Sequence, residues 1–530
     1  MRLKRLQDDY RVFEQLDESG LGKGPYGIHR VTKKGLTSAE AAAILAKAAG
    51  VEVESISYAG FKDRDGVSGQ YMSVEGGKPV EYKDGQVTIR SIGRSETPLT
   101  SENIQGNSFE LVLRDLRGHE MARIRHNLAQ AKTWGMPNYF DDQRFGCLRH
   151  GQGFVMRQLL RGDVEGAIKS LLCAPSPYGA EKVEQYKAGI MRRWGDWQEL
   201  SSFCRGRRGA SLFQYLVENP EDFKGALERG ISTRERTIHL FSYQSHLWNR
   251  VAAMWIRGVI GDDENLGWLP CDDGPLPVFR QLEKEQLEML SQESIPLYGV
   301  GVEVDGLVER YYRTVFKSEK VDPEAFLGMD ISGFRPMVEN RPLLMLPEYL
   351  RAAPAERDDV YRKTQKMRLR FTLANGQYST LVAKRLAMPT ERGEEPPMFW
   401  ISRHRLTFPD DNGRMDAPDQ VSYDERDRDT GYRGKRKDYK DQKPQRNSDR
   451  GGYRRDNRNG SNRGGYRGKA SGGGNRGKAS GGGNRGKAPG GGYKTKPKFE
   501  KESNTKPSPS PWDNRPSRKK LEEGKSSEES

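Results

Sequence analysis

The residues with the clearest chemical potential lie in the segment 59–70, which reads AGFKDRDGVSGQ. It places one carboxylate, Asp63, between two cations, Lys62 and Arg64, within a run that contains three glycines. Glycine permits sharp turns and the close approach of a partner to the backbone. Neighbouring cations favour the ionised form of an aspartate, which suits a nucleophile or an electrostatic anchor better than a proton donor. The alternative is a solvated surface turn, which is the usual place for a charged run.

A second segment, 137–146, combines an amide, aromatic rings and a cation. In its sequence, PNYFDDQRFG, Asn138 stands beside two rings, and Arg144 follows Phe140 by four residues. An extruded nucleobase needs rings for stacking and hydrogen-bond partners for its edge, so this segment could hold a base. Tyr139 and Phe145 could instead be core residues, and the pattern alone is a weak indication of base binding.

Other catalytic patterns are absent from the sequence. It has no P-loop, dinucleotide fingerprint, G-x-S-x-G or H-E-x-x-H motif. The seven histidines are scattered, and the four cysteines form no C-x-x-C pair and have no histidine at ligand spacing. We therefore expect no metal, no cofactor and no Ser/His machinery, and Asp63 is left as the best catalytic candidate. Few cysteines, no signal-peptide pattern and no run of ~18 apolar residues predict a soluble, cytoplasmic protein with no membrane segment.

The C-terminal residues 411–530 differ from the rest of the chain. They hold 31 Lys and Arg against 18 Asp and Glu, a net charge of +13, out of +15 for the whole chain. A nine-residue unit, RGKASGGGN, repeats from Arg467, and isolated tyrosines alternate with Arg-Gly steps. Such a segment buries too little apolar surface to fold, so we expect a disordered tail. Arginine and tyrosine can both stack on bases, which favours RNA binding, whereas the alternative is a solubilising tail.

The elements that must position these residues can be read from apolar spacing. A serine at position 38, a run of alanines and Gly50 predict a capped helix over 38–49. Alternating apolar residues predict strands over 109–113 and 367–373, the second ending at an Asn-Gly turn. A helical stripe over 243–258 predicts a core helix. Without regular βαβ alternation, the mixture predicts an α+β fold with a largely antiparallel sheet.

At this point the two chemical segments can be compared with a known family. Residues 59–70 resemble the A-G-x-K-D-x-x-A-x-T-x-Q signature of the TruD family of tRNA pseudouridine synthases, and 137–146 resembles its P-N-Y-F-G-x-Q-R-F-G. Further matches follow in the same order along the chain, at 8–14, 106–114, 245–249 and 371–380. The six segments span about residues 1–400, and the tail lies outside the resemblance.

The resemblance implies isomerisation of uridine to pseudouridine in RNA without a cofactor. It places the essential aspartate on Asp63 and the base-binding residues on Tyr10, Asn138, Phe140 and Tyr378. Nearby supporting residues would be Glu14, Lys62, Arg64 and Arg144. Whether Asp63 attacks the ribose or acts otherwise stays open. One departure is hard to explain: Asp141 replaces a glycine of the family motif and adds an acid where a polyanion should bind.

The implied architecture is a pseudouridine-synthase catalytic domain with an inserted α/β domain. We expect the catalytic domain to span 1–154 and 346–410, the insertion 155–345 and the tail 411–530. The expected partner is RNA, most readily tRNA with the D-arm uridine at position thirteen, and we expect a monomer. The rival interpretation is a non-catalytic RNA-binding or RNA-chaperone protein that acts through its basic tail.

Overall fold

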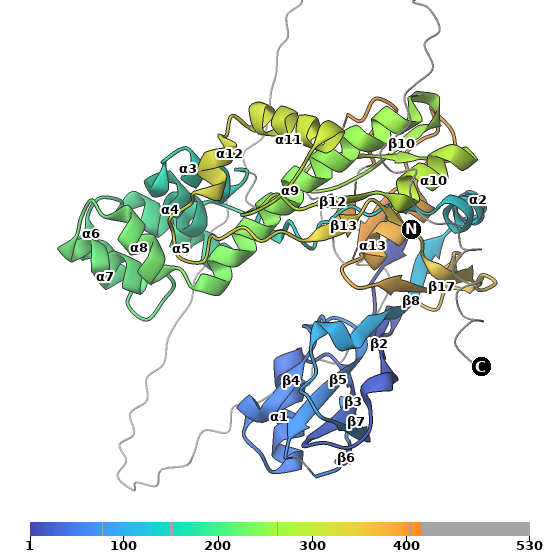
Figure 1. Cartoon of the computed structure of the whole chain (residues 1–530), viewed down its shortest axis with the longest axis horizontal. Coiled ribbons are helices and arrows are strands. Elements are labelled where there is room, and N and C mark those ends of the chain that lie inside the picture. Colours follow the sequence, from blue (N-terminus) through green and yellow to red (C-terminus); the bar gives the residue numbers. More distant parts are fainter. Residues whose placement is uncertain are drawn as a thin grey trace, which may run out of the picture. The chain divides into compact units, whose positions relative to one another are not determined.

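The computed structural model of the chain describes residues 1–414, except 77, 149–151, 177–178, 262, 402–403 and 407. From residue 415 onward the expected basic tail lies outside the described residues, so the expectation of disorder stays untested. In the described part, no helix has both the length and the apolar character needed to span a membrane. Figure 1 shows the strands of a large sheet together with many helices, which confirms the α+β prediction.

The centre of the sheet is β8 (Ile104–Leu116), which pairs with strands from both ends of the described chain. On one side it pairs antiparallel with β17 (Gln365–Ala374), so that Phe109 lies opposite Phe371. On the other side it pairs antiparallel with β2 (Tyr10–Leu16) and with β1 (Arg2–Leu3). Both predicted strands are confirmed, and the chain returns to the sheet at β17, after the long helical segment, as expected. The Asn-Gly turn also follows β17, with Gly376 at φ +77°.

The strand β2 joins this centre to an N-terminal group of strands. It pairs in parallel with β5 (Val67–Glu75), and β5 pairs antiparallel with β3 (Tyr26–Lys34). Beyond them lie β4 (Ile56–Tyr58), β7 (Val87–Ser95) and β6 (Glu81–Lys83). The helix α1 (Ser38–Ala49) covers this group, and its Leu45 packs in one apolar cluster with strand residues such as Val31, Met72 and Ile89.

The predicted helix over 38–49 is confirmed, but its cap is not Ser38. Thr37 is the N-cap: its hydroxyl accepts from Glu40 N, and the Glu40 carboxylate accepts from Thr37 N. This reciprocal arrangement is a capping box. Gly50 ends the helix in the left-handed region at φ +73°, as the glycine predicted. The Ser38 hydroxyl is therefore free to bond outside the helix.

The segment 155–345 is largely helical. Its longest helix, α9 (Thr233–Ile260), contains the predicted buried stripe. Its strands up to Pro342 form two small antiparallel sheets, β10 (Leu266–Leu269) with β11 (Leu276–Phe279) and β12 (Ser294–Pro296) with β13 (Asn340–Pro342). The other helices are α3 (Val155–Leu160), α4 (Val164–Cys173), α5 (Glu181–Arg192), α6 (Trp197–Phe203), α7 (Ala210–Glu218), α8 (Phe223–Gly230), α10 (Lys284–Gln292), α11 (Gly306–Glu319) and α12 (Pro323–Leu327).

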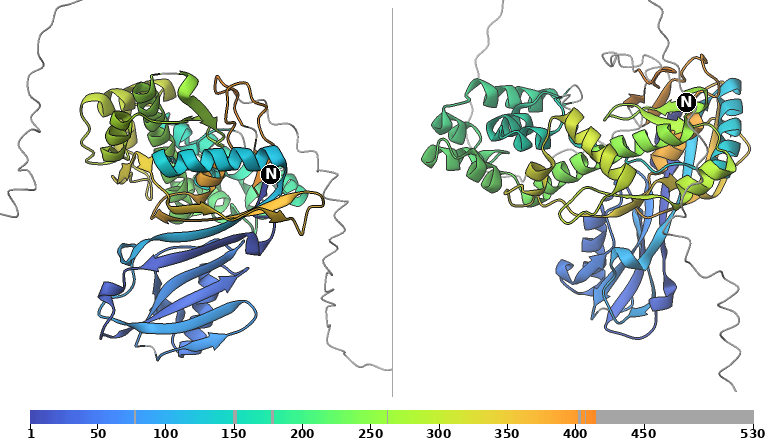
Figure 2. Two further views of the ribbon diagram at one scale, coloured as in Figure 1. Left: turned by 90° about the vertical axis from the view of Figure 1, so that its right-hand side faces the viewer. Right: turned by 45° about the horizontal axis from the view of Figure 1, so that its top comes forward.

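The C-terminal part of the fold begins where β14 (Leu344–Met345) pairs with β9 (Met136–Pro137). It continues through β15 (Glu348–Ala352), β16 (Glu356–Arg357), β17, α13 (Ser379–Ala387), β18 (Phe399–Ile401) and β19 (His404–Leu406). The left view of Figure 2 shows α2 (Gly118–Trp134), in cyan, beside the gold C-terminal strands. The buried Asn127 of α2 donates to the carbonyls of Leu386 and Met388, which fixes α13 against α2.

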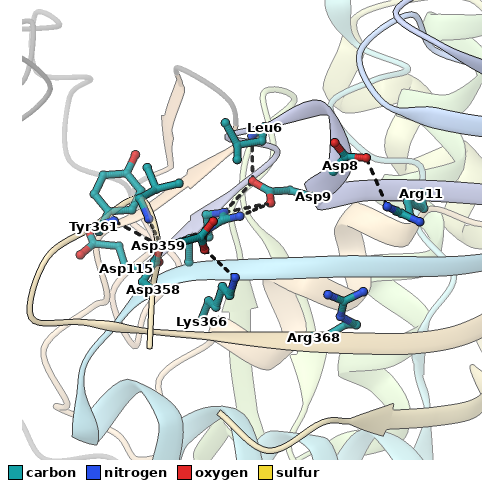
Figure 3. Close-up of polar contacts among 12 residues, drawn as sticks. Leu6, Asp8, Asp9, Arg11, Asp115, Asp358, Asp359, Tyr361, Lys366 and Arg368 are labelled. Atoms are coloured by element: carbon teal, nitrogen blue, oxygen red, sulfur yellow. Dashed lines mark hydrogen bonds and ion pairs between the residues drawn. The ribbon is translucent and has the colours of Figure 1, made fainter. Parts of the chain in front are cut away.

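A buried arginine ties the start of β2 to the turn before β17. Arg114 binds both carboxylate oxygens of Asp9 through Nε at 2.9 Å, and its Nη1 binds Asp358 at 2.9 Å and Asp359 at 2.8 Å. Figure 3 shows these aspartates converging, with Lys366 on Asp359. A buried charge is stable only when it is paired and hydrogen-bonded, as here. The network fixes the residue directly before Tyr10.

Candidate active site

Asp63 lies in the loop between β4 and β5, with its side chain 40 % exposed. Its carboxylate contacts Lys4 Nζ at 3.4 Å and accepts a hydrogen bond from Gln143 Nε2 at 3.2 Å. Lys4 precedes β2, and Gln143 belongs to the second chemical segment. The structure therefore brings the two segments singled out in the sequence into direct contact, with an accessible carboxylate between them.

The loop that carries Asp63 is held by Ser38. The buried Ser38 hydroxyl accepts from Lys62 N at 2.9 Å and donates to Gln70 Oε1 at 2.7 Å. A glycine completes the arrangement, because Gly66 has φ +152° and a Cβ there would lie 2.9 Å from the carbonyl oxygen of Tyr10. Glycine at this position therefore permits the Asp63 loop to lie directly against Tyr10.

A buried lysine supports the same loop from below. Lys33 on β3 is 1 % exposed, and its ammonium donates to the carbonyls of Asp63 at 2.9 Å, Leu36 at 2.7 Å and Lys62 at 3.3 Å. Burial lowers the pKa of Lys33 to about 8, against a smaller opposing effect of the Asp63 charge. Three backbone carbonyls thus share one cation, which leaves the Asp63 backbone little freedom.

The two cations that flank Asp63 in the sequence bind other partners in the structure. Lys62 turns to the buried Glu14 at 2.9 Å and to Asn107 Oδ1 at 2.9 Å. Arg64 binds the carbonyl of Gly35 at 3.1 Å and lies 3.7 Å from Glu40. Successive side chains in an extended loop point in different directions. The cations of Lys62 and Arg64 therefore do not contact the Asp63 carboxylate, although they flank it in the sequence. Within the described residues, the cation in contact with the Asp63 carboxylate is Lys4.

Lys4 links Tyr10 to the Asp63 carboxylate, because it contacts both. The ammonium of Lys4 lies 3.8 Å from the centre of the Tyr10 ring, a cation–π geometry. The hydroxyl of Tyr10 is 3.0 Å from Ser379 Oγ, at the start of α13 and directly after Tyr378. This one ring therefore connects the Asp63 side of the site to the C-terminal side.

Phe140 and Tyr378 form the opposite side. Their ring centroids are 6.2 Å apart at 67°, and Arg144 lies 5.4 Å from the Phe140 centroid. Phe140 is 4 % exposed, whereas Tyr378 is only half-buried and is the most accessible of the four expected base-binding residues. Asn249 of α9 fixes the Phe140 backbone, because its amide accepts from Phe140 N and donates to Phe140 O, both at 2.9 Å.

Asn138 is buried in the same segment as Phe140. Its side-chain oxygen accepts from Arg341 Nη2 at 2.8 Å, and its amide nitrogen donates to the carbonyl of Pro342 at 3.0 Å. The Arg341 guanidinium lies 4.0 Å from the Phe140 centroid, and burial lowers its pKa to about 10, so it stays charged at neutral pH. The amide nitrogen of Asn138 carries a second hydrogen that no described residue accepts.

The unexpected acid of the second segment has a structural explanation. Asp141 is 1 % exposed and pairs with the buried ammonium of Lys384 on α13, which also binds Asp142 at 2.7 Å and the carbonyl of Pro270 at 2.8 Å. Burial alone would lower the pKa of Lys384, but the two carboxylates outweigh it and raise that pKa above its usual range. The acid is therefore buried and binds α13, so it presents no charge at the surface.

This lysine also bears on the expected absence of a metal. Asp141, Asp142 and Cys271 bring three possible ligand atoms within 4.8 Å of one another. The Lys384 ammonium binds both carboxylates and supplies the positive charge that balances them. A cationic side chain in that position does the work that a bound cation would otherwise do.

Together these contacts form a closed circuit, meaning a ring of residues in which each member touches or directly follows the next. One member, Asp63, carries an accessible carboxylate. The circuit runs from Asp63 through Lys4 and Tyr10 to Ser379 and Tyr378, on to Phe140 and Arg144, and back through Gln143. Rings, amides and cations around a carboxylate can hold a planar base and its ribose next to a nucleophile. Sequence reasoning missed four of the positioning residues: Lys4, Lys33, Gln143 and Arg341.

Comparison with known proteins agrees with this geometry. The family tRNA pseudouridine synthase D (TruD) matches residues 1–386. A probable tRNA pseudouridine synthase D of Methanococcus maripaludis is 27 % identical over 395 residues, covering 73 % of this chain and 99 % of the relative. That of Pyrobaculum neutrophilum is 29 % identical over 367 residues, covering 69 % and 84 %. A crystal structure assigned to TruD of Methanosarcina mazei matches with a TM-score of 0.57 and 21 % identity, covering 72 % and 92 %, and supports the fold.

Proposed function

The chain belongs to the TruD family and isomerises uridine to pseudouridine in tRNA, and we propose that Asp63 is its catalytic residue. The observation that supports this assignment most strongly is the position of Asp63. It is an accessible carboxylate in contact with Lys4 and Gln143, at one point of a circuit that includes Tyr10, Phe140 and Tyr378. The family match gives no support to a non-catalytic RNA-binding role.

The reaction needs little beyond a positioned carboxylate. The bond between N1 of uracil and C1′ of ribose breaks, the base turns, C5 bonds to C1′, and a proton passes from C5 to N1. Atoms and charge balance without an external reactant. We propose that Lys4 and Gln143 orient the Asp63 carboxylate toward the ribose, since each contacts one of its oxygens.

The base would be held by the opposite part of the circuit. Tyr10, Phe140 and Tyr378 supply ring surface, and Asn138 offers its second amide hydrogen to a carbonyl of the uracil. The supporting residues act through contacts of their own. Glu14 holds Lys62, and Lys62 with Arg64 fixes the two sides of the Asp63 loop. Arg144, beside Phe140, would face the phosphates that flank the extruded nucleotide.

The finer features of the substrate and the chain are also proposals. We propose the D-arm uridine at position thirteen as the target, because that is what the family resemblance implies. We keep the boundaries 1–154, 155–345, 346–410 and 411–530, a monomeric state and a cytoplasmic location as working hypotheses. Native mass spectrometry and fractionation would test the last two.

The decisive experiment compares Asp63→Asn with Asp65→Asn. Both remove one charge from the same exposed loop, but only the first changes the carboxylate of the circuit. We expect purified wild-type protein and Asp65→Asn to form pseudouridine in unmodified tRNA, with the site identified by sequencing after carbodiimide treatment. Asp63→Asn should bind the same tRNA and form none. Near-normal turnover by Asp63→Asn would refute the assignment.

A further inference from the structure

Two residues before Asp63, an aromatic ring lies largely in solvent. Phe61 is 67 % exposed, although it belongs to the loop that carries the proposed catalytic carboxylate. Single exposed apolar residues are ordinary on protein surfaces. This ring differs because two neighbours orient it. Tyr58, at the end of β4, meets it edge-on at 5.8 Å and 82°.

The second neighbour comes from a distant part of the chain. The guanidinium of Arg234, in the first turn of α9, lies 4.9 Å from the centre of the Phe61 ring. Arg234 is exposed, and within the described residues no carboxylate forms an ion pair with it. An exposed ring and an unneutralised guanidinium therefore face one another across the junction between the Asp63 loop and the inserted segment.

We propose that Phe61 and Arg234 form a stacking platform for a second unpaired base of the substrate RNA, next to the uridine delivered to Asp63. The proposal rests on the proposed function. Every nucleobase has a π-face, and ring stacking together with an arginine is the usual way in which proteins hold unpaired nucleotides. The phosphate that links the two nucleotides would then lie close to the Arg234 guanidinium and neutralise its charge.

The position explains why a ring is exposed here. An extruded uridine leaves its neighbours unstacked, and a base that has lost its stacking partner regains it on a protein ring. Phe61 is separated from Asp63 by a single residue, Lys62, which points inward to Glu14. The ring and the carboxylate are thus both exposed and lie two residues apart in the same loop, within about 7 Å of chain, so neighbouring nucleotides of one RNA strand could reach both.

The test measures RNA binding and turnover separately. Phe61→Leu keeps apolar volume but removes the π-face. We expect the half-saturating tRNA concentration to rise about five- to a hundredfold, which is the stacking contribution of one base. The maximal single-turnover rate should remain within about twofold, because Asp63 and its contacts are untouched. Phe61→Trp should restore binding, and Tyr82→Leu, on the edge strand β6, is the matched control.

A second arm identifies the base. The wild type and Phe61→Leu are compared on RNAs that lack one base, either 5′ or 3′ to the target uridine. At the platform nucleotide, base removal should weaken wild-type binding and leave Phe61→Leu binding unchanged. Binding measured in the Asp63→Asn background keeps this result independent of the catalytic assignment. Unchanged half-saturation for Phe61→Leu would overturn the proposal, as would a fall in maximal rate alone, which would show that Phe61 only supports the loop.

Discussion

The ammonium of Lys33 lies 2.9 Å from the backbone carbonyl of Asp63, so one buried cation fixes the main chain of a residue whose carboxylate remains accessible. The catalytic candidate is thus rigid at its backbone and exposed at its functional group. Such preorganisation lowers the cost of bringing a nucleophile to its substrate. It also makes the site depend on the protonation state of a lysine.

Replacing Lys33 should therefore slow turnover and remove a pH dependence. Lys33→Met leaves three carbonyls without their donor, and the loss of about 1–2 kcal/mol of positioning predicts roughly tenfold slower single turnover at pH 7. In the wild type the ammonium has one donor for each carbonyl, and above pH 8 the neutral amine has only two. The maximal rate should therefore decline above about pH 8 in the wild type and stay flat in Lys33→Met.

The stability of the two proteins should diverge in the same window. The pKa of Lys33 is about 8 in the folded protein against 10.5 in an unfolded chain, so between these values the unfolded chain binds more protons. The contribution of Lys33 to the free energy of unfolding therefore rises with pH from about 8 to 10.5. Denaturant unfolding at pH 7, 8, 9 and 10 measures this free energy. If it changed with pH equally in the wild type and in Lys33→Met, the prediction would be contradicted.

Tyr378 should contribute through its ring and not through its hydroxyl. It is the most accessible of the expected base-binding residues, and base–aromatic stacking is worth about 1–3 kcal/mol. We expect Tyr378→Ala to slow turnover about ten- to a hundredfold, with a melting temperature close to that of the wild type. Tyr378→Phe, the control, should stay near wild-type turnover, and an equally slow Tyr378→Phe would place the effect in the hydroxyl.

The Asp141–Lys384 pair should matter for stability more than for chemistry. Lys384→Met leaves the buried Asp141 without its counter-charge, and breaking a buried pair costs about 3–5 kcal/mol. The double change Asp141→Asn with Lys384→Met removes both charges and should recover much of the loss. A double-mutant cycle by denaturant unfolding checks this, and purely additive effects would show that the two residues do not interact.

The tail should add affinity without adding chemistry. Residues 411–530 carry a net charge of +13, and counterion release makes binding by such a segment steeply salt-dependent. A protein ending at residue 414 should keep its single-turnover rate at saturating tRNA, bind more weakly at low salt, and lose affinity less steeply as salt rises. Equal salt slopes for the two proteins would show that the tail does not touch the RNA.

Local patterns predicted much of the fold. The strands around Phe109 and Phe371 and the core helix through Trp248 were readable because each has a regular apolar period. The helix from Ser38 was readable because a run of alanines ends at a glycine. The burial of Asp141 could not be predicted, because its partner Lys384 lies 243 residues away in the chain. Contacts at such separation leave no trace in a local window.

The candidate site shows the same division. Asp63 and Phe140 lie in recognisable motifs, and the structure brings their segments into contact through Gln143. Lys4 and Arg341 were missed because lone cations carry no periodic signal. A signal was available for Asn249, which ends the motif-like segment 245–249 and whose amide fixes Phe140.

The pairing of β8 with both β2 and β17 has a consequence for the order in which the protein is made on the ribosome. Tyr10, Asp63 and Asn138 are synthesised early, but β17 and Tyr378 emerge only after the whole helical insertion. A nascent chain that stops before residue 365 has its aspartate and an unpaired edge of β8, which invites association with other chains. Closure of that edge and delivery of Tyr378 are the same event. The enzyme therefore gains Tyr378, its last proposed uridine-binding ring, when β17 covers the exposed edge of β8 and removes the risk of association with other chains.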